Sequence, residues 1–333
     1  MNVAINGFGR IGKTFLRVIS QDKKLKNNIN VVAINIGPAK IENVATLFKY
    51  DTVMGIYPGE VEYKDGFLFV DGVKIKIICE CDPLKIDWKT LNIDFVVESS
   101  GHFTTKEKAS LHIKAGAKKV LITSPAVDED ITIIPGVNDA QYDKSKHVII
   151  SLGSCTTNCF APMIKVLKEA FNLKFGLMTT VHAYTNDQVL LDVEHKDLRR
   201  ARAAAQNIIP TKTGADKVIV KIYPELTGKL KAVSLRVPVP KVSLVDFTFE
   251  TEEVLSSDKI NDAFKKASDL SLKNILQYSV EPLVSSDFSG NNNSCIIDSL
   301  ETIAVGNLGK VFGWYDNEWG YCQRLKDFLL HNL

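Results

Sequence analysis

Gly7-Phe8-Gly9-Arg10-Ile11-Gly12 directly follows an apolar run at residues 3–6 and opens a helical pattern at residues 11–20. A second apolar run at residues 29–34 completes the order of strand, turn, helix and strand in which a GxGxxG motif binds a dinucleotide. The glycines allow a tight turn and bring backbone N–H groups close to a pyrophosphate, which the positive end of the helix attracts. We therefore expect Gly7, Gly9, Arg10, Ile11 and Gly12 to bind a dinucleotide.

The rest of the first half alternates short β-rich runs with helical patterns. Strands are expected at residues 95–98, 120–123 and 148–152, and a helix at residues 106–115. This alternation predicts an α/β fold with a doubly wound parallel sheet, the Rossmann arrangement. Residues 67–70 and 74–79, separated by Asp71-Gly72, predict a hairpin set into that sheet.

The pattern changes after Ser154, so a domain boundary is expected just before Cys155. Apolar side chains at helical spacing predict a helix of about four turns that begins near Cys155. Strand-like runs dominate from Gly176 onward, at residues 176–183, 230–238, 243–249, 294–298 and 308–315, with one helix expected at residues 257–267. These runs predict an α+β second domain with a mostly antiparallel sheet. The last residues, 319–333, predict a further helix.

Composition restricts the class of protein. The chain has 333 residues, 45% of them hydrophobic and 24% charged, as in a folded enzyme of two domains. The net charge of +2 gives no signal for a nucleic-acid or membrane partner. No basic leader precedes the first strand, and the six cysteines show no disulfide or zinc spacing. We therefore expect free thiols, no metal and a cytoplasmic protein.

The second strand ends without the acid that normally binds the adenosine ribose. Asn35-Ile36-Gly37-Pro38 occupies that point, and Lys40 follows. An acid there would bind the ribose hydroxyls and repel a 2′-phosphate. On this motif, NAD and NADP are both open.

Cys155 lies in Ser154-Cys155-Thr156-Thr157-Asn158-Cys159, where a strand gives way to a helix. The N-terminus of a helix stabilises a thiolate, so we expect the pKa of Cys155 to fall from about 8.5 toward neutrality. Cys159 is one turn further on, and we expect it to be a buried, inert thiol. His182 ends an apolar strand, where it is either a structural hydrogen-bonding group or the base that takes the proton of Cys155.

Three polar segments suggest anion binding. They are the arginine cluster at residues 199–202, Thr211-Lys212-Thr213-Gly214, and Arg236 within the apolar run 233–237. Solvated charge explains part of the first cluster. Arg236 needs a partner, because a charged side chain in a buried strand is costly unless a phosphate or carboxylate pairs with it.

These motifs together resemble the phosphorylating glyceraldehyde-3-phosphate dehydrogenase family. The similar segments are spread along nearly the whole chain, at residues 6–12, 49–51, 98–101, 154–159, 182–187, 213–214, 236–238 and 314–320. The resemblance implies an NAD(P)-binding domain at residues 1–153, completed by the helix at 317–333, and a catalytic domain at 154–316. It also implies a homotetramer that converts glyceraldehyde 3-phosphate and inorganic phosphate to 1,3-bisphosphoglycerate, in the glycolytic or the gluconeogenic direction.

The resemblance also implies roles for individual residues. Cys155 is the nucleophile that forms a thiohemiacetal and then a thioester, and His182 is the base. The expected cofactor-binding residues, besides the five of the glycine-rich turn, are Asn35, Ile36, Ser100, Ser124, Asn317 and Tyr321. The expected ligands of the substrate's own phosphate are Thr185, Asp187, Arg202 and Arg236. The expected ligands of the attacking phosphate are Ser154, Thr156, Thr213, Gly214 and again Arg236.

Two departures from the family pattern bear on the cofactor. Ile36 replaces the aspartate of NAD-specific members, which removes a barrier to NADP. Val193-Glu194 replaces a common Leu-Pro, and Glu194 would repel a 2′-phosphate if it points toward the ribose. We favour NAD and keep NADP as an alternative.

Two other functions remain as alternatives. Erythrose-4-phosphate dehydrogenase has a similar Cys–His pair, but Thr185 and Thr213-Gly214 argue against it. A non-catalytic dinucleotide-binding protein or an RNA-binding role would leave Cys155 and His182 without a purpose, and the near-neutral charge does not favour RNA.

Overall fold

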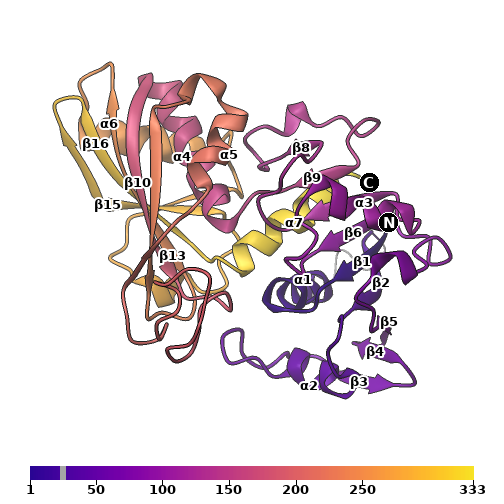
Figure 1. Ribbon diagram of the computed structural model, residues 1–333. Helices are drawn as coiled ribbons and strands as arrows, with labels where there is room; N and C mark the ends of the chain where they lie inside the picture. The colour runs from indigo at the N-terminus through magenta and orange to yellow at the C-terminus, as the bar shows by residue number, and fades with distance from the viewer. Residues whose placement is uncertain (23–27) are drawn as a thin grey trace. The chain divides into compact units, whose positions relative to one another are not determined.

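The computed structural model describes residues 1–22 and 28–333 (Figure 1). The chain forms two compact units. The first unit comprises Met1–Ile133, Asp139–Gly153 and Cys322–Leu333, and the second comprises Ile134–Asn138 and Ser154–Tyr321. The short segment Ile134–Asn138 belongs to the second unit because Ile134 packs into that unit's hydrophobic core.

The first unit is built on one sheet. Its described residues contribute nine strands in the order β3-β4-β5-β2-β1-β6-β7-β9-β8. The strands are β1 (Asn2–Asn6), β2 (Asn30–Asn35), β3 (Val61–Lys64), β4 (Phe67–Val70), β5 (Val73–Ile78), β6 (Phe95–Glu98), β7 (Lys119–Ile122), β8 (Ile131–Thr132) and β9 (Ile149–Ser151). The helices are α1 (Arg10–Gln21), α2 (Val44–Lys49), α3 (Lys106–Lys114) and most of α7 (Trp319–His331), with 3₁₀ turns at Ile41–Asn43, Pro83–Lys85 and Asp139–Gln141.

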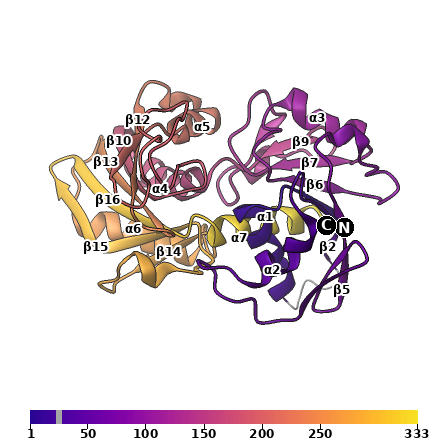
Figure 2. The ribbon, with the colours of Figure 1, turned by 60° about the horizontal axis from the view of Figure 1, so that its bottom comes forward.

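The pairing of these strands confirms the doubly wound parallel sheet. All pairs from β5 to β8 are parallel, and β3, β4 and β5 form an antiparallel edge that contains the expected hairpin. Helices α1 and α7 lie on one face of the sheet and α3 on the other (Figure 2). Alternate residues of β6 show this division, since Phe95 meets Phe328 of α7 edge-on and Val96 packs beside Trp88 on the opposite face.

The second unit, all of whose residues are described, has a seven-stranded sheet in the order β11-β12-β10-β13-β16-β15-β14. Two of its strand pairs, β10–β12 and β14–β15, are parallel and the other pairs are antiparallel, as the sequence predicts. The strands are β10 (Leu173–Ala183), β11 (Ile209–Thr211), β12 (Leu230–Val237), β13 (Ser243–Thr251), β14 (Leu276–Ser279), β15 (Cys295–Val305) and β16 (Leu308–Tyr315). The helices are α4 (Cys155–Phe171), α5 (Ala215–Ile222) and α6 (Ser257–Asp269), with 3₁₀ turns at Pro224–Leu226 and Ser285–Phe288.

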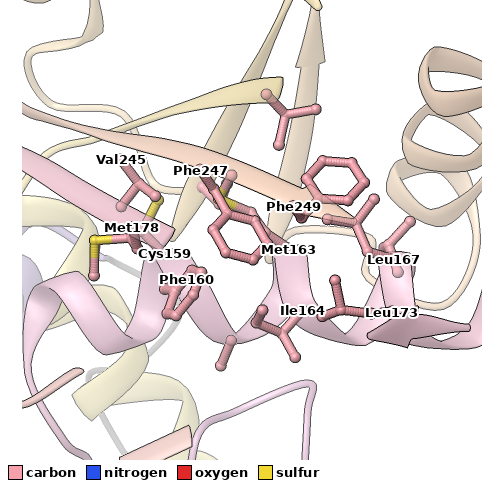
Figure 3. Packing of buried hydrophobic residues seen from close by; sticks show 14 of the residues in the cluster. Cys159, Phe160, Met163, Ile164, Leu167, Leu173, Met178, Val245, Phe247 and Phe249 are labelled. Atoms are coloured by element: carbon pink, nitrogen blue, oxygen red, sulfur yellow. The ribbon is translucent and has the colours of Figure 1, made fainter. Parts of the chain in front are cut away.

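Helix α4 packs along one face of this sheet and forms the centre of the core (Figure 3). Phe160 of α4 meets Phe247 of β13 edge-on, with ring centres 4.9 Å apart, and Phe247 stacks on Phe249 at 5.4 Å. Met163 and Leu167 continue the same apolar stripe of the helix. This packing fixes the axis of α4 and therefore the place of its first residue, Cys155.

The opposite face of the sheet carries exposed apolar side chains. Side chains of β10 alternate, so that Met178 is buried while Phe175 and Leu177 are 48% and 67% exposed. The strand register brings further exposed apolar residues to the same face, namely Val233, Ile303, Val305 and Leu308.

The sequence analysis missed two helices, α2 and α5. It expected one helix between the strands of the second unit, which is wrong because α5 is also present. Helix α5 is eight residues long and contains the β-branched run Val218-Ile219-Val220, which has strand propensity. Its buried residues, including Ile219 and Ile222, join the core, and this packing stabilises the helix. No helix in the described part of the chain combines the length and the apolar character needed to span a bilayer.

Two leucines of the second unit test the role of the core. Leu167 is fully buried in α4, whereas Leu270, at the end of α6, is 67% exposed. We expect Leu167→Ala to lower the free energy of unfolding by about 2–5 kcal/mol, because it leaves a cavity. The same change at Leu270 should alter the free energy by less than about 0.5 kcal/mol. Urea denaturation followed by circular dichroism measures both, and equal losses would contradict this account of the core.

Candidate active site

Cys155 is the first residue of α4, and its surroundings are set by the cap of that helix. The Ser154 hydroxyl accepts a hydrogen bond from the Thr157 N–H at 3.1 Å and so caps the helix. Cys155 Sγ lies 3.5 Å from Nε2 of His182, near the end of β10. The structure thus brings together the two residues that the sequence predicts as nucleophile and base.

The tautomer of His182 follows from its other nitrogen. Nδ1 lies 2.6 Å from the carbonyl oxygen of Ala183, which can only accept, so Nδ1 carries the proton. In the neutral ring, Nε2 is then an acceptor directed at the Cys155 thiol. The ring is also held edge-on against Tyr315, with ring centres 6.0 Å apart. This arrangement suits proton transfer from sulfur to Nε2.

The prediction of a lowered pKa for Cys155 is wrong. Although part of the side chain reaches the surface, dense packing around the thiol raises its pKa, and this effect outweighs the charge of Arg236 and hydrogen bonds from Thr156. Burial and then the charge of Arg236 lower the pKa of His182 to about 3. The resting pair is therefore a neutral thiol beside a neutral imidazole.

A hydroxyl network lies behind the pair. The buried Tyr315 hydroxyl is 2.9 Å from Thr156 Oγ1 and 2.8 Å from Thr180 Oγ1. Burial strongly raises the pKa of Tyr315, so its hydroxyl stays protonated. The network fixes the Thr156 side chain one residue after Cys155. Cys159, as expected, lies in the core with no exposed surface.

Arg236 carries the charge nearest to this pair. Strand β12 runs parallel to β10, and its register sets Arg236 beside His182. One guanidinium nitrogen, Nη1, donates to Thr185 Oγ1 at 2.7 Å, whereas the buried Nε finds no acceptor among the residues described. Burial lowers the pKa of Arg236, although an arginine stays charged. A buried cation with an unused donor suits an anionic ligand.

The arginine that joins Asp187 is Arg200, not the expected Arg202. Nη1 of Arg200 contacts the Asp187 carboxylate, and its Nε donates to Thr211 Oγ1 at 2.9 Å. Arg202 is 62% exposed and pairs with Asp192. In this structure the side chain of Arg202 thus binds a surface carboxylate, whereas Arg200 takes the inner position.

The other expected residues of the second unit lie at the ends of elements. Thr213 and Gly214 precede α5, and Gly214 is the cap residue of that helix without a side-chain hydrogen bond. Asn317 follows β16 and is 6% exposed, with its Oδ1 bonded to the Ser243 hydroxyl. Tyr321 is a buried residue within α7.

The first unit contains a cavity of about 500 Å³ at the carboxyl ends of its central strands. A side chain at Gly7, whose φ is +93°, would overlap the backbone of Ser100, and one at Gly12 would overlap the Gly7 carbonyl. Gly9 precedes α1 as its cap residue, with open space where a side chain would be and no side-chain cap, so a ligand can approach the start of the helix. The lining consists of Asn6, Gly7, Gly9, Asn35, Ile36, Gly37, Pro38, Glu80, Cys81, Ser99, Ser100, His102 and Phe103.

Among the expected cofactor residues of the first unit, four do not line this cavity: Arg10, Ile11, Gly12 and Ser124. Arg10 forms an ion pair with Asp51, Ile11 lies in the first turn of α1, and Ser124 follows β7 with its hydroxyl on the Pro125 carbonyl. Arg10 and Ile11 present the backbone N–H groups of the helix start, which remains compatible with a pyrophosphate.

The sequence analysis missed Glu80 and Cys81. Both follow β5, which pairs with β2, so they reach the same edge of the sheet as Asn35. The Asn35 amide exchanges hydrogen bonds with the Glu80 backbone, and Glu80 Oε1 accepts from the Cys81 N–H at 2.8 Å. The signal in the sequence is the strand before Glu80, because carboxyl ends of parallel strands gather at one edge.

Comparison with known proteins identifies the family. The family profile described as "Glyceraldehyde 3-phosphate dehydrogenase, NAD binding domain" matches residues 1–106, and that described as "Glyceraldehyde 3-phosphate dehydrogenase, C-terminal domain" matches residues 154–317. The chain belongs to the glyceraldehyde 3-phosphate dehydrogenase family. It is 49% identical over 332 residues to glyceraldehyde-3-phosphate dehydrogenase 2 of Bacillus subtilis, covering 99% of this chain and 96% of that protein. It is 51% identical to glyceraldehyde-3-phosphate dehydrogenase of Priestia megaterium and 50% identical to that of Geobacillus stearothermophilus, in each case covering 98% of this chain and 96% of the relative.

The two family profiles match different compact units of the chain. The segment matched as an NAD-binding domain lies in the first unit, with the glycine-rich turn and the cavity. The segment matched as the C-terminal domain lies in the second unit, with Cys155 and His182.

The charge of Arg236 yields a test on the ligand-free protein. We expect Arg236→Gln to raise the pKa of Cys155 further, because the substitution removes a cation that stabilises the thiolate. The midpoint of the pH dependence of iodoacetamide alkylation at Cys155 then moves to higher pH, and alkylation at a fixed pH near 8 slows. Arg202→Gln is the matched control, because that arginine is exposed and paired elsewhere. An unchanged midpoint in Arg236→Gln would refute the electrostatic account.

Proposed function

We propose that the protein catalyses the reversible oxidation of D-glyceraldehyde 3-phosphate to 1,3-bisphosphoglycerate with NAD and inorganic phosphate. The observation that carries this proposal is the 3.5 Å contact between Cys155 Sγ and His182 Nε2, with Nδ1 of the imidazole bound to a backbone carbonyl. Membership of the family supports the same reaction, since its relatives are named for this substrate.

The first step is covalent. The Cys155 sulfur attacks the aldehyde carbon as His182 Nε2 accepts the thiol proton. His182 then passes this proton to the former carbonyl oxygen, which becomes a hydroxyl, and the imidazole is neutral again. The lowered pKa of His182 and the raised pKa of Cys155 favour this concerted transfer over a resting ion pair. The product is a thiohemiacetal on Cys155.

The second step oxidises that adduct. NAD, when bound, supplies the acceptor for the hydride that leaves the thiohemiacetal carbon. His182 removes the proton of the hydroxyl oxygen as this carbon becomes a thioester. The oxidation energy is retained in the thioester, because carbon stays bonded to sulfur and not to water.

The third step transfers the acyl group to inorganic phosphate and releases the Cys155 sulfur. We propose Ser154, Thr156, Thr213, Gly214 and Arg236 as ligands of this attacking phosphate. The start of α5 beside Gly214, a residue without a side chain, and the fixed hydroxyl of Thr156 support the assignment. For the phosphate of the substrate itself we propose Thr185, Asp187 and Arg236.

Arg200 replaces Arg202 in the proposed phosphate-binding group. Its support is the contact with Asp187 and the bond to Thr211, together with the 62% exposure of Arg202.

NAD is the cofactor of this family's domain, and the residues of the first unit fit it. The glycine-rich turn at residues 7–12 and the start of α1 suit a pyrophosphate. Asn35, Ile36 and Ser100 line the same cavity. Ile36 carries no charge against a 2′-phosphate, so NADP is retained as a second cofactor. Glu80, a carboxylate on the cavity wall near Ile36, favours NAD by the same charge argument that applies to Glu194.

We also propose the domain limits, assembly and location of the protein. Residues 1–153 with 317–333 are assigned as the NAD(P)-binding domain and 154–316 as the catalytic domain. A homotetramer is supported by the exposed apolar face that includes Phe175 and Leu177, which a second copy can cover. The six free thiols support a cytoplasmic location.

The proposed reaction is tested by the absorbance of reduced nicotinamide, with glyceraldehyde 3-phosphate, NAD and phosphate as reactants. We expect Cys155→Ser to lower kcat by at least about 10³-fold, the scale on which loss of a nucleophile acts. Cys159→Ser makes the same substitution one helical turn on and should retain most of the activity, because Ser can replace the Cys159 hydrogen bond to the Gly313 carbonyl.

Omission of phosphate provides the second arm of this test. Turnover should nearly stop, since the thioester then lacks its acceptor. Unchanged turnover of Cys155→Ser, or sustained turnover without phosphate, would contradict the proposal.

A further inference from the structure

Ser243 lies where three strands of the second unit meet. It is the first residue of β13, which runs between β10 and β16 in the sheet. Strand β10 ends here just after His182, and β16 ends here at Tyr315, whose register partner is Ser243. The side chain is 1% exposed. A buried hydroxyl at this point needs partners, and it finds them on both neighbouring strands.

The Ser243 hydroxyl makes two hydrogen bonds of opposite direction. Its oxygen accepts from the Ala183 N–H at 3.1 Å, and its proton is donated to Oδ1 of Asn317 at 3.3 Å. The carbonyl of the same Ala183 accepts the Nδ1 proton of His182. One serine therefore connects the backbone that orients the base to the side chain of Asn317.

The bond from Ser243 sets the polarity of the Asn317 amide. With Oδ1 held inward, the amide nitrogen is the end left to bind a ligand. Within the described residues, Nδ2 makes no hydrogen bond, and it does not belong to the buried atoms without partners, so it reaches the surface. A donor with this orientation selects an acceptor, such as a carboxamide oxygen.

A second contact links the same two segments of the chain, between a residue just before Ser243 and the residue just before Asn317. Lys241 Nζ pairs with Asp316 Oδ2 at 2.9 Å, and both side chains are almost fully buried. Between Lys241 and Ser243, the β-branched Val242 has φ at +67°, a conformation that costs energy and persists only where the surroundings impose it. Lys241 thus holds Asp316, and Ser243 holds Asn317.

We infer that Ser243 is a positioning residue for the cofactor: it holds the Asn317 amide with its nitrogen outward, as a donor to the carboxamide oxygen of nicotinamide. This inference rests on the proposed function and on the expectation that Asn317 binds the cofactor. Ser243 itself does not touch the ligand. Its hydrogen bond to Oδ1 favours this orientation of the amide, whereas the flipped amide would present its oxygen to the carboxamide oxygen.

The test compares two ligands and two serines. ADP-ribose lacks the nicotinamide ring, so it reports any general damage to cofactor binding. Ser234, in β12 of the same sheet, is 2% exposed like Ser243, but its hydroxyl has no hydrogen-bond partner among the described residues. Ser234→Ala is therefore a matched control for Ser243→Ala.

Titration calorimetry on the full chain gives the dissociation constants of NAD and ADP-ribose for the wild type and for both variants. We expect Ser243→Ala to raise the Kd of NAD by roughly 3- to 10-fold, the factor that one neutral hydrogen bond supplies. The Kd of ADP-ribose should change by less than about 2-fold, and Ser234→Ala should leave both constants unchanged. Parallel weakening of NAD and ADP-ribose, or no weakening of either, would overturn the inference.

Misfolding of the variant and failure of the proposed function can each be told apart from failure of this inference. Should Ser243→Ala fail to fold by circular dichroism, Ser243→Cys keeps the volume with a weaker donor, and it must weaken NAD more than ADP-ribose. Should the wild type bind ADP-ribose but gain nothing from the nicotinamide of NAD, this inference fails while the proposed reaction is still judged by the Cys155 assay. Absence of any NAD binding by the wild type contradicts both.

Discussion

The contact between the Cys155 sulfur and the His182 imidazole is the constraint on which the chemistry of the second unit depends. Both groups lie in dense surroundings that disfavour their charged forms, as the raised pKa of the thiol and the lowered pKa of the imidazole show. Such a pair is useful only if its geometry is held, because proton transfer over this distance tolerates little displacement. The fold supplies this rigidity from elements whose own packing is independent of the site. Helix α4 is fixed by its apolar stripe, and β10 is fixed between two neighbouring strands.

The polar side chains around Cys155 and His182 come from different strands and contact one another where those strands end. Arg236 lies beside His182 because β12 and β10 are in parallel register, and its charge favours the thiolate while opposing the imidazolium. Tyr315 bridges two threonine hydroxyls behind the pair, and Ser243 joins the His182 strand to Asn317. Arg236, Tyr315 and Ser243 each lie at or near the end of a strand, where strand pairing holds the backbone in place. In the first unit, the glycine-rich turn and Glu80 likewise lie at the carboxyl ends of parallel strands.

Much of this arrangement could be predicted from local signals in the sequence. The glycine-rich turn, the alternation of strands and helices, and the cap at Ser154 act over a few residues, so they are visible without coordinates. Other features depend on packing between distant segments. The direction of the Cys155 pKa shift required the burial imposed by neighbouring strands. The choice of Arg200 over Arg202 lay in an irregular segment with several arginines, where only the path of the chain decides which one turns inward. Helix α5 was missed because its β-branched run favours a strand until the core packs against it.

The central claim is that the acyl group of the reaction is carried on the Cys155 sulfur. The most direct measurement mixes equimolar protein, NAD and glyceraldehyde 3-phosphate without inorganic phosphate, quenches in acid and analyses the peptides by mass spectrometry. We predict that the peptide containing Cys155 gains the mass of a phosphoglyceroyl thioester and loses it when phosphate is added before the quench. A reduced cofactor formed without any adduct on Cys155, or an adduct on another cysteine such as Cys159, would contradict the account.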